Sequence, residues 1–341
     1  MKKILICTIS IIGLISCQEK KTNLTCERID YLTKTKQSVA KQYWTDFNRE
    51  TLFGPMLYYT KNGLYTINAN DKLKDKIDIS PYEGNNSNVE IGFSKKIDTT
   101  KLYMYVTYNP TDTLALDYQN TLGMFSDVEL TEKFIPDVKD TEEWMSMVIH
   151  EMFHQYQRKF KKFRKQQLHS QKEFKRDTLH SFYDNQDWFS KSVELENASL
   201  LKIIKDNNND SIKIYISKYL KDKGKRIARV KSEFKIDISE LEGSLSKSEG
   251  TARYIEYRVK SHLKAADYNI NLQKIDNKYI VNRYEDYDLE KETWMYNTFN
   301  AYYYSIGFNL TRVLEKLKID YQKTIFTENK PFDAYLNEYL K

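Results

Sequence analysis

The sequence DTEEWMSMVIHEMFH spans residues 140–154 and carries the clearest structural signal in the chain. Asp140 or Thr141 can cap a helix, and the two glutamates that follow are favoured at its positive end. Apolar residues then recur at helical intervals, at Trp144, Met147, Val148 and Met152. The pattern predicts an amphipathic helix that begins near residue 140.

The second half of this helix holds the motif His150-Glu151-Met152-Phe153-His154. Positions i and i+4 lie on one face of a helix about one turn apart, so that both imidazoles can bind one ion. Zinc in such a site activates water for hydrolysis near neutral pH, and Glu151 is placed to take and return the proton. The alternative is a helix whose histidines only form core hydrogen bonds. With 5 His in 341 residues a chance match is rare, so we predict a Zn²⁺ site with Glu151 as general base and acid.

Catalytic zinc normally takes three protein ligands, and the residues alone leave the third one open. A third histidine in the spacing HExxHxxGxxH is absent, since Arg158 and Phe160 occupy that region. Glu173 lies in a stretch rich in Lys and Arg that is typical of a solvated helix face. The other candidates are Glu194, Glu196 and Glu249.

A second motif follows in the segment Glu249-Gly250-Thr251-Ala252-Arg253-Tyr254. HExxH with a later E-G-x-A-x-Y resembles the gluzincin metallopeptidases, especially the membrane-alanyl-aminopeptidase-like proteins. In that superfamily the glutamate of the second motif is the third zinc ligand, at the start of a helix packed on the HExxH helix. The resemblance implies that Glu249 completes the site, and that Gly250 and Ala252 allow the two helices to approach closely.

The chain departs from the aminopeptidases in two respects. Ser248 stands where they usually have asparagine, and the interval between the two motifs is much longer than theirs. A related group of HExxH proteins, whose HELFHxxQ resembles His150 to Gln157, carries a helical insertion of this kind. In this chain the insertion corresponds to residues 155–248.

The same resemblance extends to an aromatic segment with the spacing Y-x-x-G, Tyr304-Ser305-Ile306-Gly307. Gluzincins often use a tyrosine hydroxyl to stabilise the oxyanion formed when water attacks a carbonyl. The resemblance implies that Tyr304 has this role, with Tyr303 and Tyr302 as alternatives. Three adjacent tyrosines on a helix are equally typical of packing.

The N-terminus has the features of a targeting segment. Two lysines precede an apolar run from Ile4 to Ile15, which is too short to cross a bilayer as a helix. The run ends in Leu14-Ile15-Ser16-Cys17, which resembles the lipobox of bacterial lipoproteins, so Cys17 is expected to carry lipid and anchor the protein in the bacterial cell envelope. The alternative is an ordinary secretory signal with a chance cysteine.

Composition narrows the remaining possibilities. Of the 3 Cys, only Cys26 is left without a targeting role, so no disulfide is expected within the mature chain. The net charge of +6 is ordinary for a soluble surface and gives no reason to expect nucleic acid as a partner. The chain is long enough to bury a sizeable core.

The expected fold is α+β, with a small N-terminal β-sheet followed by a predominantly helical, zincin-like catalytic region. We expect a signal peptide at residues 1–16, a polar tether at 17–27 and one unit over 28–341, in which 28–139 hold a first helix and the sheet and 140–341 the catalytic part. The first helix is predicted at 27–50, strands at 52–59, 63–68, 89–93 and 102–108, and later helices at 188–205, 210–236, 246–264, 295–318 and 331–340.

These features favour a membrane-anchored zinc metallopeptidase that hydrolyses peptide bonds in a peptide or protein substrate. Two alternatives remain open: a non-catalytic, surface-anchored binding lipoprotein that keeps the fold, and a metal that only stabilises the chain. The sequence does not distinguish cleavage within a substrate from cleavage at its end, nor the periplasmic from the outer face.

Overall fold

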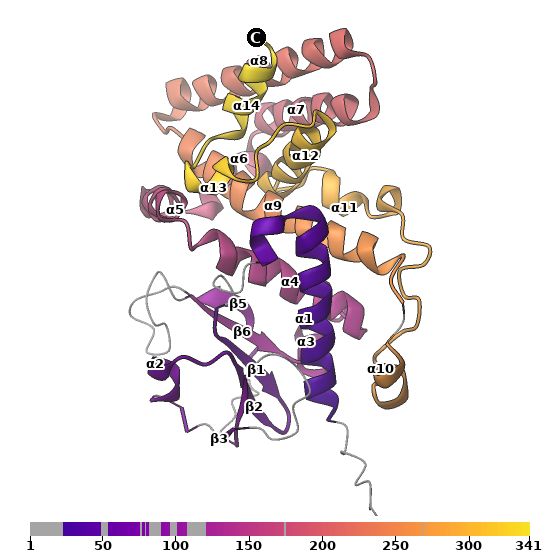
Figure 1. The fold of residues 1–341 in the computed structure, drawn as a ribbon. Coiled ribbons are helices and arrows are strands. Elements are labelled where there is room, and N and C mark those ends of the chain that lie inside the picture. Colours follow the sequence, from indigo (N-terminus) through magenta and orange to yellow (C-terminus); the bar gives the residue numbers. More distant parts are fainter. Residues whose placement is uncertain are drawn as a thin grey trace, which may run out of the picture.

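The structure is a computed structural model that describes residues 23–48, 54–75, 77–78, 80–81, 90–95, 101–107, 121–173, 175–267 and 269–341. The predicted signal peptide and lipobox, with Cys17, lie outside these residues. The described residues confirm the α+β prediction, because a small sheet is followed by a mainly helical region (Figure 1). None of the helices described is both long enough and apolar enough to cross a membrane.

The sheet has six strands in the order β3-β4-β2-β1-β6-β5. Their bounds are β1 Met56–Thr60, β2 Gly63–Ile67, β3 Ser80–Pro81, β4 Ile91–Ser94, β5 Met104–Thr107 and β6 Leu122–Ser126. The predicted hairpin between β1 and β2 is present, and the Thr60 hydroxyl accepts hydrogen bonds from the amides of its turn. The sequence analysis missed β6, which runs parallel to β1, because all five of its residues are buried and show no alternation.

The first helix, α1 Leu24–Tyr43, begins and ends earlier than predicted. Its start lies inside the segment expected to be a tether, because the Asn23 side chain caps it by accepting a hydrogen bond from the Cys26 amide (3.2 Å). The helix ends before Trp44, whose fully buried ring packs edge-on against Phe153 (4.9 Å between centroids). A core contact therefore ends the helix where the apolar periodicity alone would continue it.

The helical region contains helices close to those predicted at 188–205, 210–236, 246–264 and 331–340, together with several short ones. The helix predicted at 295–318 is divided into Thr293–Tyr296 and Tyr303–Lys316. The helices are α2 Asp71–Lys74, α3 Val128–Phe134, α4 Thr141–Gln157, α5 Lys161–Glu173, α6 Arg176–Asn185, α7 Asp187–Lys205, α8 Asn209–Phe234, α9 Ser239–Leu263, α10 Ile270–Ile275, α11 Thr293–Tyr296, α12 Tyr303–Lys316, α13 Thr324–Thr327 and α14 Phe332–Tyr339.

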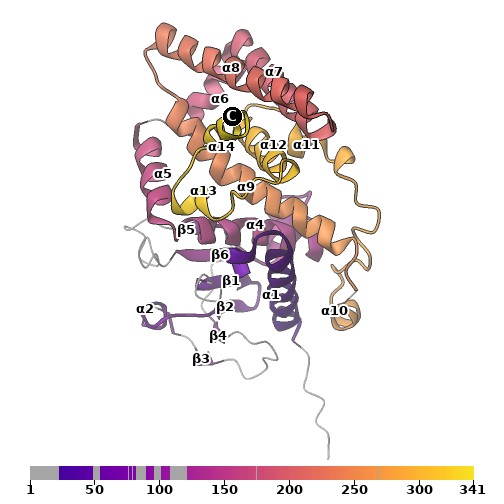
Figure 2. The same ribbon diagram turned by 45° about the horizontal axis from the view of Figure 1, so that its top comes forward.

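Helix α9 lies at the centre of the molecule and contacts α1, α4, α5 and α12 (Figures 1 and 2). The sheet lies at one end and the α7–α8 hairpin at the other. Because α9 already begins at Ser239, Glu249 lies in the middle of a long helix and not near its start as the sequence suggested. One central helix can therefore present side chains to both α4 and α12.

Gly250 allows close helix packing, as expected, but its partner is α12 and not the HExxH helix α4. A Cβ atom on Gly250 would lie 2.2 Å from the backbone of Gly307, and one on Gly307 would lie 1.9 Å from the backbone oxygen of Ser246. Helices α9 and α12 thus meet backbone to backbone. The glycine of the Y-x-x-G segment has a packing role that places Tyr304 beside α9.

Candidate metal centre

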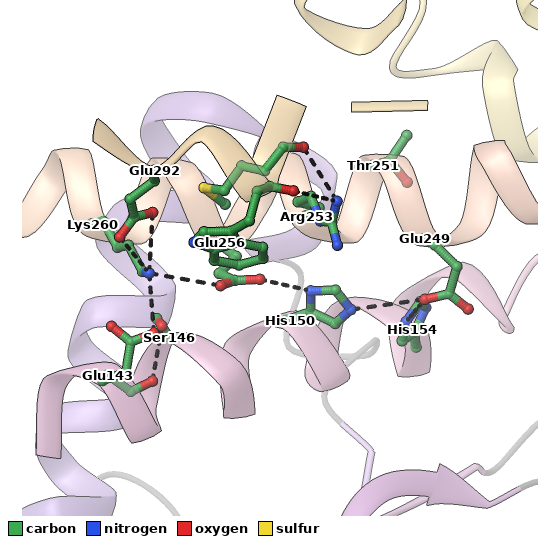
Figure 3. A network of polar contacts seen from close by, with 12 residues as sticks. Glu143, Ser146, His150, His154, Glu249, Thr251, Arg253, Glu256, Lys260 and Glu292 are labelled. Carbon is green, nitrogen blue, oxygen red and sulfur yellow. Dashed lines mark hydrogen bonds and ion pairs between the residues drawn. The ribbon is translucent and has the colours of Figure 1, made fainter. Parts of the chain in front are cut away.

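Helix α4 presents its two histidines to α9 because its other face is anchored in the core. Asp140 caps the helix by accepting a hydrogen bond from the Glu143 amide (2.7 Å). Trp144, Val148 and Phe153 are fully buried on the core side. This arrangement directs the side chains of positions 150 and 154 toward the middle of α9 (Figure 3).

The structure brings together His150, His154 and Glu249 as three buried groups that could hold a metal ion. One potential ligand atom from each residue lies within 4.8 Å of the others. Glu249 Oε2 is 3.1 Å from Nε2 of His154 and 3.9 Å from Nε2 of His150 (Figure 3). Ligands bound to one tetrahedral zinc at about 2.0–2.2 Å are separated by roughly 3.4 Å, so the donor set fits zinc without a large rearrangement.

Hydrogen bonds from the Nδ1 atoms to acceptor oxygens orient both rings with Nε2 toward the shared centre. His150 Nδ1 contacts Glu256 Oε2 (3.3 Å) and His154 Nδ1 contacts Gln157 Oε1 (2.9 Å). The Gln157 amide nitrogen donates to the Ser248 carbonyl and the Thr251 hydroxyl, which fixes Oε1 as the acceptor. Both Nδ1 atoms are then donors, so each Nε2 has a lone pair for a metal.

Ser248, the departure from the aminopeptidase pattern, contributes to this orientation. Its hydroxyl donates to Gln157 Oε1 (3.2 Å) and accepts a hydrogen bond from Gln167 (3.2 Å). The serine therefore supports the acceptor that holds His154, and its presence is compatible with a metal ligand at the next position.

The second oxygen of Glu249 is held by Arg176, a residue that sequence reasoning missed. Arg176 Nη2 donates to Glu249 Oε1 at 2.7 Å from α6, within the insertion. Burial alone would raise the pKa of Glu249, but before a metal binds the charges of protonated His154, of Arg176 and of protonated His150 and a hydrogen bond to His154 hold it well below its usual range. The carboxylate is thus ionised and oriented. Arg176 is one of many basic residues in its stretch, so no sequence signal singles it out.

Glu151 lies next to His150 and is half-buried. Burial lowers the pKa of His150, but the hydrogen bond to Glu256 and the charges of Glu151, Glu256 and Glu249 raise it above its ordinary value. The Glu151 carboxylate forms no hydrogen bond or ion pair within the described part of the chain. It is therefore available to a reacting molecule.

The three adjacent tyrosines separate in space. Burial and the charge of Glu249 raise the pKa of Tyr304, which lies beside that ligand. The Tyr303 hydroxyl is 3.2 Å from His180 Nε2, and burial raises its pKa to about 12. The Tyr302 hydroxyl donates to Glu242 (2.7 Å), away from the metal centre. Tyr304 and Tyr303 thus both lie close enough to Glu249 for its charge to act on them, whereas Tyr302 belongs to another cluster.

The other glutamates considered as the third metal ligand either lie away from the two histidines or have side chains outside the described residues. Glu196 is buried in an ion pair with Arg226 (2.7 Å). Glu194 is exposed on α7. The side chain of Glu173 is outside the described residues.

No family model, curated protein or solved structure matches the chain. The chemistry of the site is therefore inferred from its own donor set. Two imidazoles and one carboxylate, with a free glutamate alongside, are the groups found in catalytic zinc sites with three protein ligands.

Proposed function

We propose that this chain is a zinc-dependent hydrolase, specifically a gluzincin-like metallopeptidase that is anchored to the bacterial envelope through Cys17. The observation that carries the proposal is the convergence of His150, His154 and Glu249 beside the unpaired carboxylate of Glu151. The resemblance of the two motifs to gluzincins agrees with this arrangement.

When bound, zinc would supply a Lewis acid and lower the pKa of water to about 7. Glu151 would take the proton of the attacking water and later deliver it to the leaving amine. Tyr304 keeps its proton, because its pKa is raised, and its hydroxyl would donate a hydrogen bond to the carbonyl oxygen that becomes negative. Arg176, Gln157 and Glu256 would hold the three ligands in position.

The number of ligands favours catalysis over a purely structural metal. Structural zinc sites are closed by four protein ligands, whereas the cluster found among the described residues has three. A non-catalytic binding lipoprotein with the same fold has no chemical need for Glu151. Both alternatives become outcomes of one experiment.

The test compares the native chain with Glu151→Gln and His154→Ala, each prepared with zinc. We expect about one zinc per chain in the native protein and in Glu151→Gln, but peptide hydrolysis reduced about 10²–10⁴-fold in Glu151→Gln. His154→Ala should lose both metal and hydrolysis. Full turnover by Glu151→Gln would overturn the mechanism, and metal binding without hydrolysis by the native chain would favour the non-catalytic readings.

A further inference from the structure

Arg253 is a buried arginine near the candidate metal centre, and it forms no ion pair with a carboxylate among the described residues. Its side chain belongs to α9, one turn after Glu249, and the residue is 5% exposed. Only Nη1 donates hydrogen bonds within the described structure, to the carbonyls of Trp294 (3.4 Å) and Met295 (3.2 Å) and to the Ser305 hydroxyl (3.3 Å). Nε and Nη2 donate none to the described residues.

Two other buried cations of the helical region are paired with carboxylates, whereas the buried Lys247 is held by the oxygens of Asn329. Lys260, two turns further along the same side of α9, contacts Glu143 (3.0 Å) and Glu292 (3.1 Å) (Figure 3). Arg226 is held between two glutamates at 2.7 Å each. The charges of Glu256 and Glu249 act on Arg253, but neither carboxylate forms an ion pair with it, and a buried guanidinium with unused donors can accept a further anion. The substrate can supply this anion.

Aromatic rings frame the guanidinium of Arg253. Its carbon atom lies 4.6 Å from the ring centre of Tyr304, 5.1 Å from that of Trp294 and 5.7 Å from that of Phe299. Trp294 is 47% exposed and Phe299 is 37% exposed, so both rings can contact a bound molecule. Exposed aromatic rings around a cation form a surface suited to a carboxylate next to an apolar side chain.

The position of Arg253 along α9 fits the dimensions of a peptide. Four residues of helix rise about 6 Å from Glu249 to Arg253. One extended substrate residue spans about 3.3–3.6 Å, and one hydrogen bond at its far end adds about 3 Å, which together are close to this rise. If the attacked carbonyl lies near Glu249, the far end of the next substrate residue lies within reach of Arg253.

We propose that Arg253 is the specificity-determining residue of this site and binds a substrate carboxylate one residue beyond the bond that is cut, with Trp294 and Phe299 contacting the side chain of that residue. The carboxylate is the free C-terminus of the substrate, so the enzyme removes C-terminal residues. This inference rests on the proposed hydrolase function. A carboxylate on an Asp or Glu side chain offers the same chemistry and is distinguished by the experiment.

The binding experiment uses zinc-loaded Glu151→Gln protein, in which hydrolysis is blocked. The probes are an N-acetylated dipeptide with a free C-terminus, its C-terminal amide, and an amidated dipeptide that ends in glutamate. Isothermal titration should show the free acid binding about 10- to 100-fold more tightly than either amide, because a charge-assisted hydrogen bond is lost in both. Equal affinity for the acid and its amide would overturn the proposal, and tight binding of the glutamate amide alone would assign the site to a side-chain carboxylate.

Further substitutions in the Glu151→Gln protein test whether Arg253 causes the preference for the free acid over its amide. Arg253→Met should abolish the difference between acid and amide, and Arg253→Lys should retain part of it. Arg258→Gln is the matched control, because this partly buried arginine of α9 is paired with Glu315, not placed at the metal centre, and should keep the full preference. If Arg253→Met does not fold, a smaller acid-over-amide preference in Arg253→Lys than in Arg258→Gln supports the proposal, and equal preferences overturn it.

Hydrolysis of matched free and amidated peptides by the native chain separates the two proposals. Cleavage of the peptide with a free C-terminus, and not of its amide, supports both the hydrolase function and the role of Arg253. Equal cleavage of both peptides overturns the role of Arg253 and leaves the hydrolase proposal standing. Preferential binding of the free acid without any cleavage supports the role of Arg253 and overturns the hydrolase proposal.

Discussion

Glu142 is a buried acid in the first turn of α4 that takes no part in the metal centre. It is 2% exposed, Oε1 has no hydrogen-bond partner among the described residues, and Oε2 accepts only a weak bond from the Ile280 amide (3.3 Å). Burial, helped by the charges of Asp140 and Asp276, raises the pKa of Glu142 to about 8. The folded protein therefore holds a proton here that the unfolded chain releases near pH 4.5.

This residue predicts a pH dependence of stability. Between about pH 4.5 and 8 the folded state binds more protons at Glu142 than the unfolded state, so the free energy of unfolding falls as pH rises. Glu142→Gln imitates the protonated acid and should become more stable than the native chain by about 2–4 kcal/mol at pH 9, with little difference at pH 4.5. Urea unfolding at both pH values measures this difference.

Glu233→Gln provides the control for this prediction, because Glu233 lies on the exposed side of α8 in an ion pair with Arg229. It should change stability little and equally at both pH values. A Glu142→Gln variant that follows the native chain at every pH would show that the buried carboxyl ionises without cost.

At the scale of elements, the crossing of α9 and α12 determines the second wall of the site. Gly250 and Gly307 let the two backbones touch, and this contact places Tyr304 beside Glu249 and Arg253. The crossing explains why the metal centre needs residues from four helices, α4, α6, α9 and α12, although two of them supply the ligands.

Gly307→Ala should therefore damage stability and the site together. The new Cβ would lie 1.9 Å from a backbone oxygen of α9, which cannot move like a side chain. We expect a loss of about 2–4 kcal/mol in the free energy of unfolding, measured by urea denaturation. Gly224→Ala on α8 is the matched control, since its Cβ meets nothing within 4 Å, and it should stabilise the helix by about 0.4–1 kcal/mol. Equal effects of the two substitutions would contradict the close crossing.

At the scale of the whole molecule, the candidate metal centre joins segments that are distant in the chain. His154 and Glu249 are 95 positions apart, the segment between them includes α5 to α8, and Arg176 from this segment hydrogen-bonds Glu249. A metal bound to the folded state but not to the unfolded chain stabilises the fold by mass action. The centre should thus contribute to the stability of the helical region.

Removal of the metal should lower the melting temperature. At free zinc about a thousand times its dissociation constant, binding contributes about 4 kcal/mol, which corresponds to a shift of several degrees in a protein of this size. Calorimetry with zinc and with a chelator measures the shift, and His154→Ala should show none. Identical melting of the native chain in both conditions would mean that the cluster does not bind zinc under these conditions.

The sequence by itself determined the α+β class, most of the long helices, the β1–β2 hairpin and the candidate group around His150, because local periodicity, capping and motif spacing are written in neighbouring residues. Only the tertiary structure shows what depends on distant contacts. Strand β6 pairs with β1, Trp44 ends α1 by packing on Phe153, and Gly250 packs on α12. Arg176 hydrogen-bonds Glu249, whereas Glu196 pairs with Arg226 and Tyr302 hydrogen-bonds Glu242. These outcomes arise from side chains far apart in the chain, and no local pattern contains the packing that brings them together.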